Sequence, residues 1–187
     1  MTATLVRGSR VTLRPFRPEE LDVLLEVRRR PPDLAYPVAE EPDVEVLRGR
    51  VERSGSFAEG ELLLAIEASG RLIGEIQGRQ PRHGLPPGVF ELGVELFDRD
   101  DRGKGLGAEA VALMASHLFD EHGAHRVQAS TDVENHPMRA VLRRLGFAEE
   151  GILRGFMPAA NGARDYAMYA TTKDDWGTRR PTWTRTD

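Results

Sequence analysis

The sequence predicts a mixed α/β domain in which most neighbouring strands run antiparallel. Short segments with apolar side chains at alternate positions, which indicate strands, are interspersed with longer segments whose apolar side chains recur every three or four residues, which indicate helices. Ser69-Gly70 and Asn161-Gly162 each separate two strand-like segments and are typical of tight hairpin turns. The length of 187 residues fits one domain with a substantial core.

The first half of the chain is expected to contribute a strand, two helices and three strands. The predicted segments are a strand at 10–16, helices at 17–30 and 43–54, and strands at 61–68, 71–78 and 89–97. Pro31 and Pro32 end the first helix, and a loop rich in proline and acidic residues follows it. Gly93 lies inside the last of these strands, where a glycine marks a β-bulge or a close approach of another backbone.

The second half is expected to contribute two helices and three strands. A helix begins at Leu106, carries apolar residues every four positions and ends at His122-Gly123. Asn135 stands at the N-cap of the second helix. The remaining predicted segments are a strand at 125–131, that helix at 137–145, and strands at 152–157 and 165–171. The chain from Lys173 onward is polar and is expected to fray. We predict a single domain over 1–176 and a polar tail over 177–187.

Composition excludes several kinds of site. The chain has no cysteine, which excludes disulfides, thiolate metal sites and a cysteine nucleophile. The five histidines lack metal-ligand spacing, so no metal is expected, and the net charge of −4 argues against nucleic acid as a partner. No apolar run is long enough for a signal peptide or a membrane span, which favours a cytoplasmic protein without a membrane partner. A homodimer, the commonest soluble assembly, stays open.

The glycine-rich stretch RGKGLG at 102–107 allows three interpretations. It can be a turn without a ligand. It also satisfies G-x-G-x-x-A, the loosest form of the dinucleotide fingerprint, but five residues separate it from the preceding strand and Gln128 stands where an acidic ribose partner is needed, although Asp132 is close. An ATP-type P-loop is excluded because glycine follows Lys104.

The third interpretation is an anion site at the start of a helix. Backbone amides of residues 103–108 would point into one concavity and add to the positive end of the helix dipole. Gly105 and Gly107 lack Cβ atoms, so a bulky diphosphate can approach the main chain. Arg102 and Lys104 add local positive charge to an acidic protein.

Arg-x-x-Gly-x-Gly between a strand and a helix resembles the acetyl-CoA-binding motif of the GNAT (Gcn5-related) N-acetyltransferases. ELGVELFDRDDRGKGLGAEAV and STDVENHPMRAVLRRLGFAEEGILRG are similar to the cofactor-binding core of the subfamily that includes the ribosomal-protein N-terminal acetyltransferases. VTLRPF and RDYAMYATTKDDW also fit, so the resemblance covers residues 10–176 in order. It implies a mostly antiparallel sheet of six to seven strands, helices on both faces and a V-shaped split for the cofactor.

The resemblance also implies the residues that bind acetyl-CoA, which would act as cosubstrate. The pantetheine arm would pair with the main chain of Val94, Glu95, Leu96 and Phe97. The diphosphate would lie among Arg102, Gly103, Lys104, Gly105, Leu106, Gly107 and Ala108. Asn135 matches the family's asparagine beside the cofactor arm, although a plain N-cap is an equal alternative. Arg139 and Arg143 are candidates for the nucleotide end, or else solvated helix arginines.

The implied reaction is direct attack of a primary amine, from a peptide or a small molecule, on the thioester. The amine is mostly ammonium at neutral pH, so a carboxylate must accept its proton. Glu91, which matches the family's strand glutamate before a glycine bulge, is the first candidate base and Glu75 the second; each can instead be an ordinary strand glutamate. A freed N–H near Val94 or Glu95 at that bulge would polarise the thioester carbonyl.

One departure from the family pattern concerns the proton donor to the leaving thiolate. Met138 and Leu142 occupy the positions of the family's tyrosine or serine, and neither can donate a proton. Water, Tyr166 or Tyr169 could replace that donor, or the thiolate leaves unassisted. The alternative function is therefore a non-catalytic module that binds or senses acyl-CoA, and a nicotinamide-dependent oxidoreductase is the third hypothesis.

Overall fold

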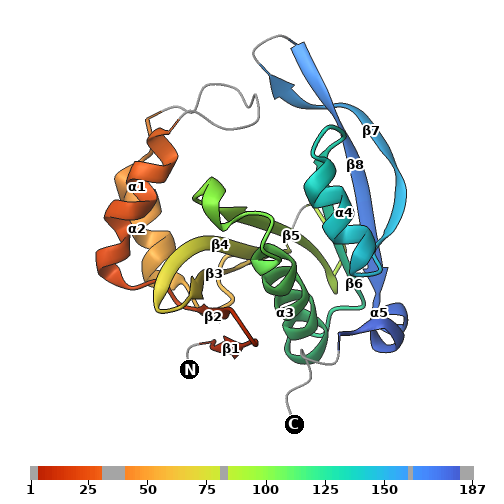
Figure 1. Cartoon of the computed structure of the whole chain (residues 1–187), viewed down its shortest axis with the longest axis horizontal. Coiled ribbons are helices and arrows are strands. Elements are labelled where there is room, and N and C mark those ends of the chain that lie inside the picture. The colour runs from red at the N-terminus through yellow and green to blue at the C-terminus, as the bar shows by residue number, and fades with distance from the viewer. Residues whose placement is uncertain (1–3, 31–40, 81–83, 160–161, 182–187) are drawn as a thin grey trace.

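An eight-stranded sheet forms the centre of the fold (Figure 1). The computed structural model describes residues 4–30, 41–80, 84–159 and 162–181. The strands lie in the order β1-β2-β3-β4-β5-β6-β8-β7, and all neighbours pair antiparallel except β5 and β6. Their bounds are β1 Val6–Arg7, β2 Thr12–Arg14, β3 Glu61–Ala68, β4 Arg71–Arg79, β5 Val89–Leu96, β6 Arg126–Asp132, β7 Ala148–Ala159 and β8 Gly162–Thr172. The strand beyond the expected six to seven is β1, whose two residues are too few to produce an alternating pattern.

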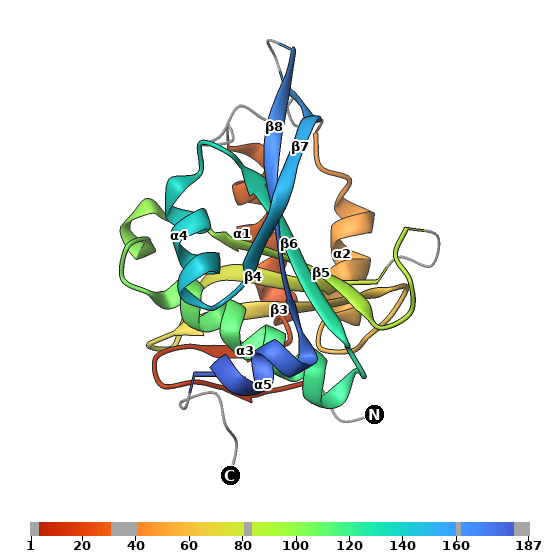
Figure 2. The same cartoon turned by 90° about the vertical axis from the view of Figure 1, so that its right-hand side faces the viewer.

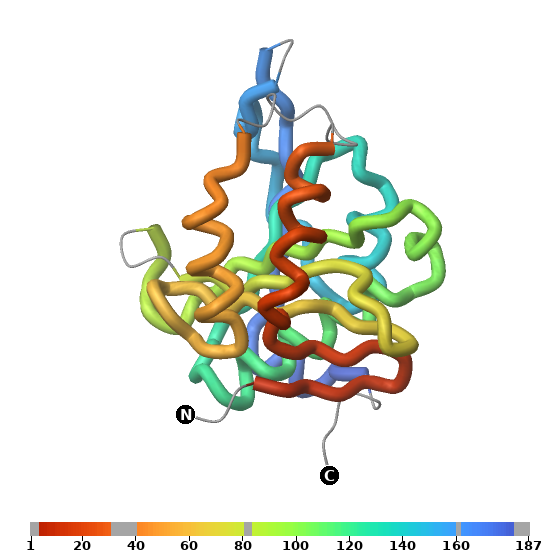
Figure 3. Tube along the Cα trace, turned by 90° about the vertical axis from the view of Figure 1, so that its left-hand side faces the viewer, coloured from red at the N-terminus to blue at the C-terminus, as the bar shows by residue number. Residues whose placement is uncertain are grey.

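Helices cover both faces of this sheet, as expected. They are α1 Leu21–Arg29, α2 Val44–Arg53, α3 Leu106–Glu121, α4 His136–Arg144 and α5 Lys173–Arg179. Side chains of β3 alternate between the faces: Leu63 and Ala65 pack with residues of α1 and α2, whereas Leu62, Leu64 and Ile66 pack with residues of α3. Figure 3 shows α1 and α2 side by side in front of the sheet. No helix in the described ranges is long and apolar enough to cross a membrane.

The sheet splits between its two parallel strands. β5 and β6 pair only through Val89↔Arg126, Phe90↔Val127 and Glu91↔Gln128. Beyond Glu91, β5 continues with β4 as its ladder partner, and β6 continues with β8. The strands therefore diverge toward their C-terminal ends, which gives the expected V-shaped opening.

The β-bulge expected at Gly93 is absent. The β4–β5 register runs without a shift from Gly74↔Leu96 to Arg79↔Glu91. Instead, the glycine accommodates a side chain, since a Cβ at Gly93 would lie 2.7 Å from the Nε2 atom of Gln77. The close approach of another backbone, the other expectation for this glycine, is not found either, because the nearest neighbour is the Gln77 side chain on β4.

The expectation that the chain frays from Lys173 onward is wrong for the described residues. α5 begins at Lys173 and is capped by Thr172, whose hydroxyl accepts from the Asp175 amide. Trp176 is 2% exposed, donates its indole N–H to the Ser116 hydroxyl and stacks on Phe119. One tryptophan therefore fixes this polar segment beside α3 (Figure 2), an effect that average polarity does not reveal.

Replacing Trp176 with alanine tests the role of α5. We expect Trp176→Ala to lower the free energy of unfolding by about 3–5 kcal/mol, the usual cost of truncating a buried aromatic side chain. Lys173→Ala, an exposed substitution in the same helix, serves as the control and should change it by less than about 0.5 kcal/mol. Urea unfolding measures both, and equal stabilities would show that α5 does not stabilise the domain.

Candidate active site

The N-terminus of α3 lacks a side-chain cap. Its N-cap is Gly105, in the left-handed conformation with φ +81°, and no side chain among the described residues caps it. By contrast, Asp43, Asn135 and Thr172 cap α2, α4 and α5 with side-chain oxygens. The first helical bond of α3 runs from the Glu109 amide to the Gly105 carbonyl, 3.1 Å apart. The amides that precede it are therefore available to an anion.

The three glycines of this segment are not required for the same physical reason. Gly103 and Gly105 have φ of +73° and +81°, a conformation that L side chains rarely adopt. Gly107 has an ordinary helical conformation, and a Cβ there would meet only Leu96 at 3.6 Å, an ordinary contact. Chain geometry requires the first two glycines, whereas the packing around Gly107 leaves room for a side chain.

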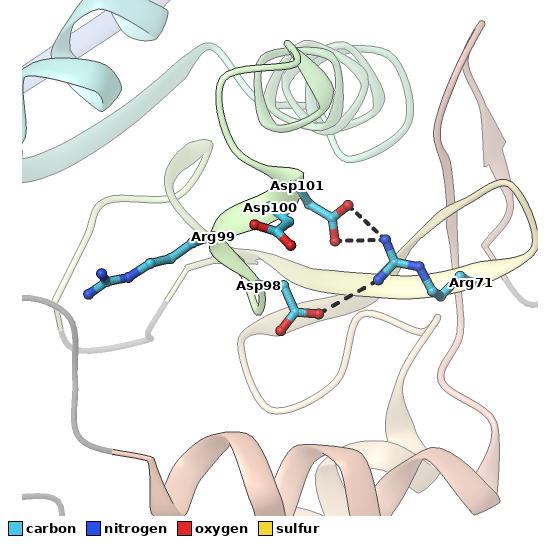
Figure 4. A pocket seen from close by; sticks show the side chains of 5 residues that line it. All are labelled: Arg71, Asp98, Arg99, Asp100 and Asp101. Carbon is cyan, nitrogen blue, oxygen red and sulfur yellow. Dashed lines mark hydrogen bonds and ion pairs between the residues drawn. The ribbon is translucent and has the colours of Figure 1, made fainter.

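Arg71 of β4 holds the beginning of the same loop (Figure 4). Its Nη2 donates to both carboxylate oxygens of Asp101, at 2.7 and 2.9 Å, and its Nη1 lies 3.7 Å from Asp98. These residues line a hollow of about 380 Å³ together with Arg99 and Asp100. Three aspartates against two arginines make this hollow unsuitable for phosphate, and we assign it the structural task of fixing the turn before the glycines.

The edge of β5 exposed by the split offers main-chain groups for an extended ligand. The Phe97 amide donates to the Ile73 carbonyl, 3.0 Å away on the β4 side. Because backbone groups alternate along a strand, the amides of Val94 and Leu96 face the side that β6 has left, and the amide of Glu95 faces β4. Of the two residues expected near a freed N–H, only Val94 has this orientation.

The two candidate bases lie on one face of the sheet, the face covered by α1 and α2. Glu91 is half-buried at the last paired position before the split and accepts from Arg79 Nη2 at 2.7 Å. Glu75 is buried, and Arg28 of α1 bridges it to Glu95, with N–O distances of 2.6 and 3.0 Å. Along the β4–β5 ladder, the pair that contains Glu75 (Glu75↔Glu95) lies four positions from the pair that contains Glu91 (Arg79↔Glu91).

Burial raises the pKa of Glu75 above its ordinary value. The neighbouring Glu95 carboxylate acts in the same direction, while attraction to Arg28 and Arg50 opposes the rise without cancelling it. Glu75 is therefore a carboxyl group whose proton affinity suits proton transfer, but the side chain of Arg28 covers it.

Two other predicted site residues, Asn135 and Arg139, form hydrogen bonds within the protein. Asn135 caps α4 by accepting from the Met138 amide at 3.3 Å, and its Nδ2 donates to Thr131. Arg139 donates to the Tyr169 hydroxyl at 3.1 Å and to the Val133 carbonyl at 2.8 Å. Asn135 therefore caps α4, a role that can coexist with a position beside the cofactor arm, and Arg139 lies in a network on the α4 side.

Tyr169 is fully buried in that network. Its hydroxyl donates to Glu149 and accepts from Arg139. The register from Glu91 through Gln128 to Ala170 places Ala170 on the face of Glu91, so the adjacent Tyr169 points to the opposite face. The structure therefore does not bring Tyr169 together with the candidate bases.

No sequence pattern indicated Arg10, which contacts the glycine loop, or Glu109, which binds Arg10. Arg10 and Glu109 form a salt bridge of 2.9 Å across 99 positions, and Arg10 also donates to the Lys104 carbonyl at 2.7 Å. No spacing rule connects residues so far apart. The only available sign was a glutamate in the first turn of a helix already expected to bind an anion.

Sequence comparison relates this chain to acetyltransferases. Residues 10–148 match the family model of the acetyltransferase (GNAT) domain. A mycothiol acetyltransferase of Pseudarthrobacter chlorophenolicus is 36% identical over 92 residues, which are 49% of this chain and 28% of that protein. The uncharacterized N-acetyltransferase YnaD of Bacillus subtilis is 29% identical over 88 residues, 47% of this chain and 51% of YnaD. The chain thus spans about half or less of the length of these relatives.

Solved structures share the fold over nearly the whole chain. An acetyltransferase (GNAT family) from Bacillus anthracis has a TM-score of 0.74 at 21% identity, covering 91% of this chain and 99% of that one. Mycobacterium smegmatis RimJ in complex with CoA-disulfide has a TM-score of 0.71 at 22% identity, covering 97% and 96%. At these identities the likeness shows the fold alone. Because the family model matches well over half of the residues, the chain belongs to the GNAT acetyltransferase family.

Proposed function

We propose that this protein transfers the acetyl group of acetyl-CoA to a primary amine, at a peptide N-terminus or on a small molecule. One observation carries the proposal: residues 97–105 connect the strand β5, which borders the split in the sheet, to the uncapped N-terminus of α3. A family known for acetyl transfer, a group of free amides and an unpaired strand edge all favour the same ligand.

The residues present fit the parts of coenzyme A. The amides of Leu106, Gly107 and Ala108 would donate hydrogen bonds to the diphosphate, because they precede the first helical hydrogen bond and lie at the positive end of a 16-residue helix. The amides of Val94 and Leu96 would pair with the pantetheine arm as an added strand does, while the Leu96 carbonyl accepts from Arg102 Nη2 at 3.2 Å. When bound, acetyl-CoA supplies a thioester, an activated acyl group.

The chain's own groups then have two tasks. The Val94 amide, on the open edge of β5, is the candidate donor toward a carbonyl oxygen. Glu91 is the candidate base, because it is half-buried at the point where the strands separate, whereas Arg28 covers Glu75. Tyr169 is held between Glu149 and Arg139, and both Met138 and Leu142 lack a suitable proton. Tyr166, which the β6–β8 register places on the same face as Glu91, is the tyrosine that stays a candidate proton donor.

A side chain at position 107 should block the diphosphate without disturbing the fold. Cβ atoms of a helix tilt toward its N-terminus, so a leucine at 107 would project over the first-turn amides. We expect Gly107→Leu to weaken CoA binding by about tenfold or more, equivalent to at least ~1.4 kcal/mol, in isothermal titration calorimetry. Gly177→Leu is the matched control, because that helical glycine also has open space around it and lies in α5.

Activity is tested with the same proteins. Wild type mixed with acetyl-CoA and a panel of peptides, polyamines and aminoglycosides should release free thiol with at least one acceptor. Binding of CoA without thiol release from any acceptor would favour the sensing module over the enzyme. Equal affinity of Gly107→Leu and wild type for CoA would show that the diphosphate does not bind at this loop.

Substituting the two glutamates distinguishes the candidate bases. We expect Glu91→Gln to lower kcat about 10²-fold or more, the usual contribution of a general base, while the affinity for CoA stays unchanged. Glu75→Gln, on the same face and also paired with an arginine, should retain most of the activity. Initial rates at saturating acetyl-CoA measure both, and the reverse order would assign the base to Glu75.

Glu75 should also make stability depend on pH. Because its pKa is raised in the folded state, its contribution to stability is complete below the unfolded-state pKa of about 4.3 and is lost as pH rises through the folded-state pKa. Wild type should therefore lose stability relative to Glu75→Gln as pH rises from 4 toward neutrality. Urea unfolding of both proteins across this range checks the sign. A free energy of unfolding that rises with pH for wild type relative to Glu75→Gln would contradict the prediction.

A further inference from the structure

Arg10 contacts the glycine loop from the side opposite to the proposed diphosphate. Its Nη1 donates to the Lys104 carbonyl at 2.7 Å and its Nη2 to the Gly105 carbonyl at 3.3 Å. Its Nε donates to Oε2 of Glu109 at 2.9 Å. All three nitrogens of one guanidinium are therefore used, two of them on consecutive peptide groups of the loop.

Glu109 fixes the direction of this guanidinium. Its carboxylate is 1% exposed, and its Oε1 accepts from the Arg10 amide at 2.8 Å, the Ser9 hydroxyl at 3.1 Å and the Val11 amide at 3.4 Å. Gly8 lets the turn approach so closely, because a Cβ there would lie 2.4 Å from Oε1. Burial raises the pKa of Glu109, but the hydrogen bonds from Arg10, Val11 and Ser9 outweigh burial and lower it below its ordinary value.

These contacts determine where the loop amides point. In a trans peptide the N–H and C=O groups point in opposite directions. Because the carbonyls of Lys104 and Gly105 point toward Arg10, the amides of Gly105 and Leu106 point away from it. Arg10 also neutralises Glu109, whose charge close to the start of α3 would otherwise oppose the binding of an anion.

We propose that Arg10 and Glu109 are positioning residues for the cofactor loop, which determine the affinity for the diphosphate of CoA and not the rate of acetyl transfer. This role rests on the proposed function of the site. Neither residue needs to touch the ligand, since the structure connects them to it through the peptide groups of the loop.

Arg10→Met tests this role, because methionine retains much of the aliphatic stem but cannot donate to the carbonyls. We expect KM for acetyl-CoA to rise about tenfold while kcat at saturating acetyl-CoA stays within about twofold of wild type. S-acetylpantetheine, which lacks the diphosphate, should be used equally well by both proteins. Arg10→Lys should rescue only part of the affinity, because one ammonium cannot reproduce three donors in a fixed plane.

Arg53→Met is the matched control for losing an exposed, ion-paired arginine. Arg53 pairs with Glu59 at 3.2 Å and its side chain is 44% exposed, close to the 52% of Arg10, but it lies on α2 away from the loop. This variant should keep the wild-type KM. Thermal unfolding without ligand establishes that each variant is folded, and Glu109→Gln, if folded, should show the same pattern as Arg10→Met.

The outcomes distinguish this inference from the proposed function. Wild type that binds no CoA in calorimetry would overturn both. Wild type that binds CoA, together with folded Arg10→Met that binds it equally well, would overturn the positioning role alone. A loss of kcat with unchanged KM, or an equal loss with S-acetylpantetheine, would also contradict it.

Discussion

The separation of β5 from β6 after three paired residues is the constraint on which the site depends. Continued pairing would occupy the Val94 and Leu96 edge, and the loop after β5 would end against another strand. Because the strands diverge, an extended ligand can lie where β6 would have been, and residues 97–105 lead from β5 to the uncapped end of α3. In the proposed function, the strand edge and the helix end are two parts of one binding surface, the first for an amide-containing arm and the second for a diphosphate.

The loop between these two parts is held at both ends by arginines, one from strand β4 and one from the turn between β1 and β2. Arg71 binds the turn at Asp98 and Asp101, and Arg10 binds the carbonyls of Lys104 and Gly105. Gly103 and Gly105, both in the left-handed conformation, belong to this loop. Ordering them in a free loop would cost much conformational entropy. External contacts of this kind keep the amides oriented before a ligand arrives, so less free energy is lost on binding.

Local patterns predicted the elements and the anion loop, while long-range pairings decided the rest. The hairpin at Ser69-Gly70, the helix from Leu106 and the cap at Asn135 follow from nearby residues, and the structure contains all three. The prediction of a bulge at Gly93 was wrong, because the glycine instead leaves space that the Gln77 side chain, on another strand, fills. α5, the Arg10–Glu109 pair and the Tyr169 network each depend on contacts between distant segments, which periodicity and spacing do not encode.

Amide-resolved NMR during titration with two ligands tests the central claim most directly. CoA contains the diphosphate and pantetheine does not, so the two ligands separate the helix end from the strand edge. CoA should shift the amide signals of Leu106, Gly107 and Ala108, and pantetheine should shift that of Val94 while leaving the three α3 amides unchanged. Unshifted α3 amides at saturating CoA would show that the diphosphate binds elsewhere and would contradict the account.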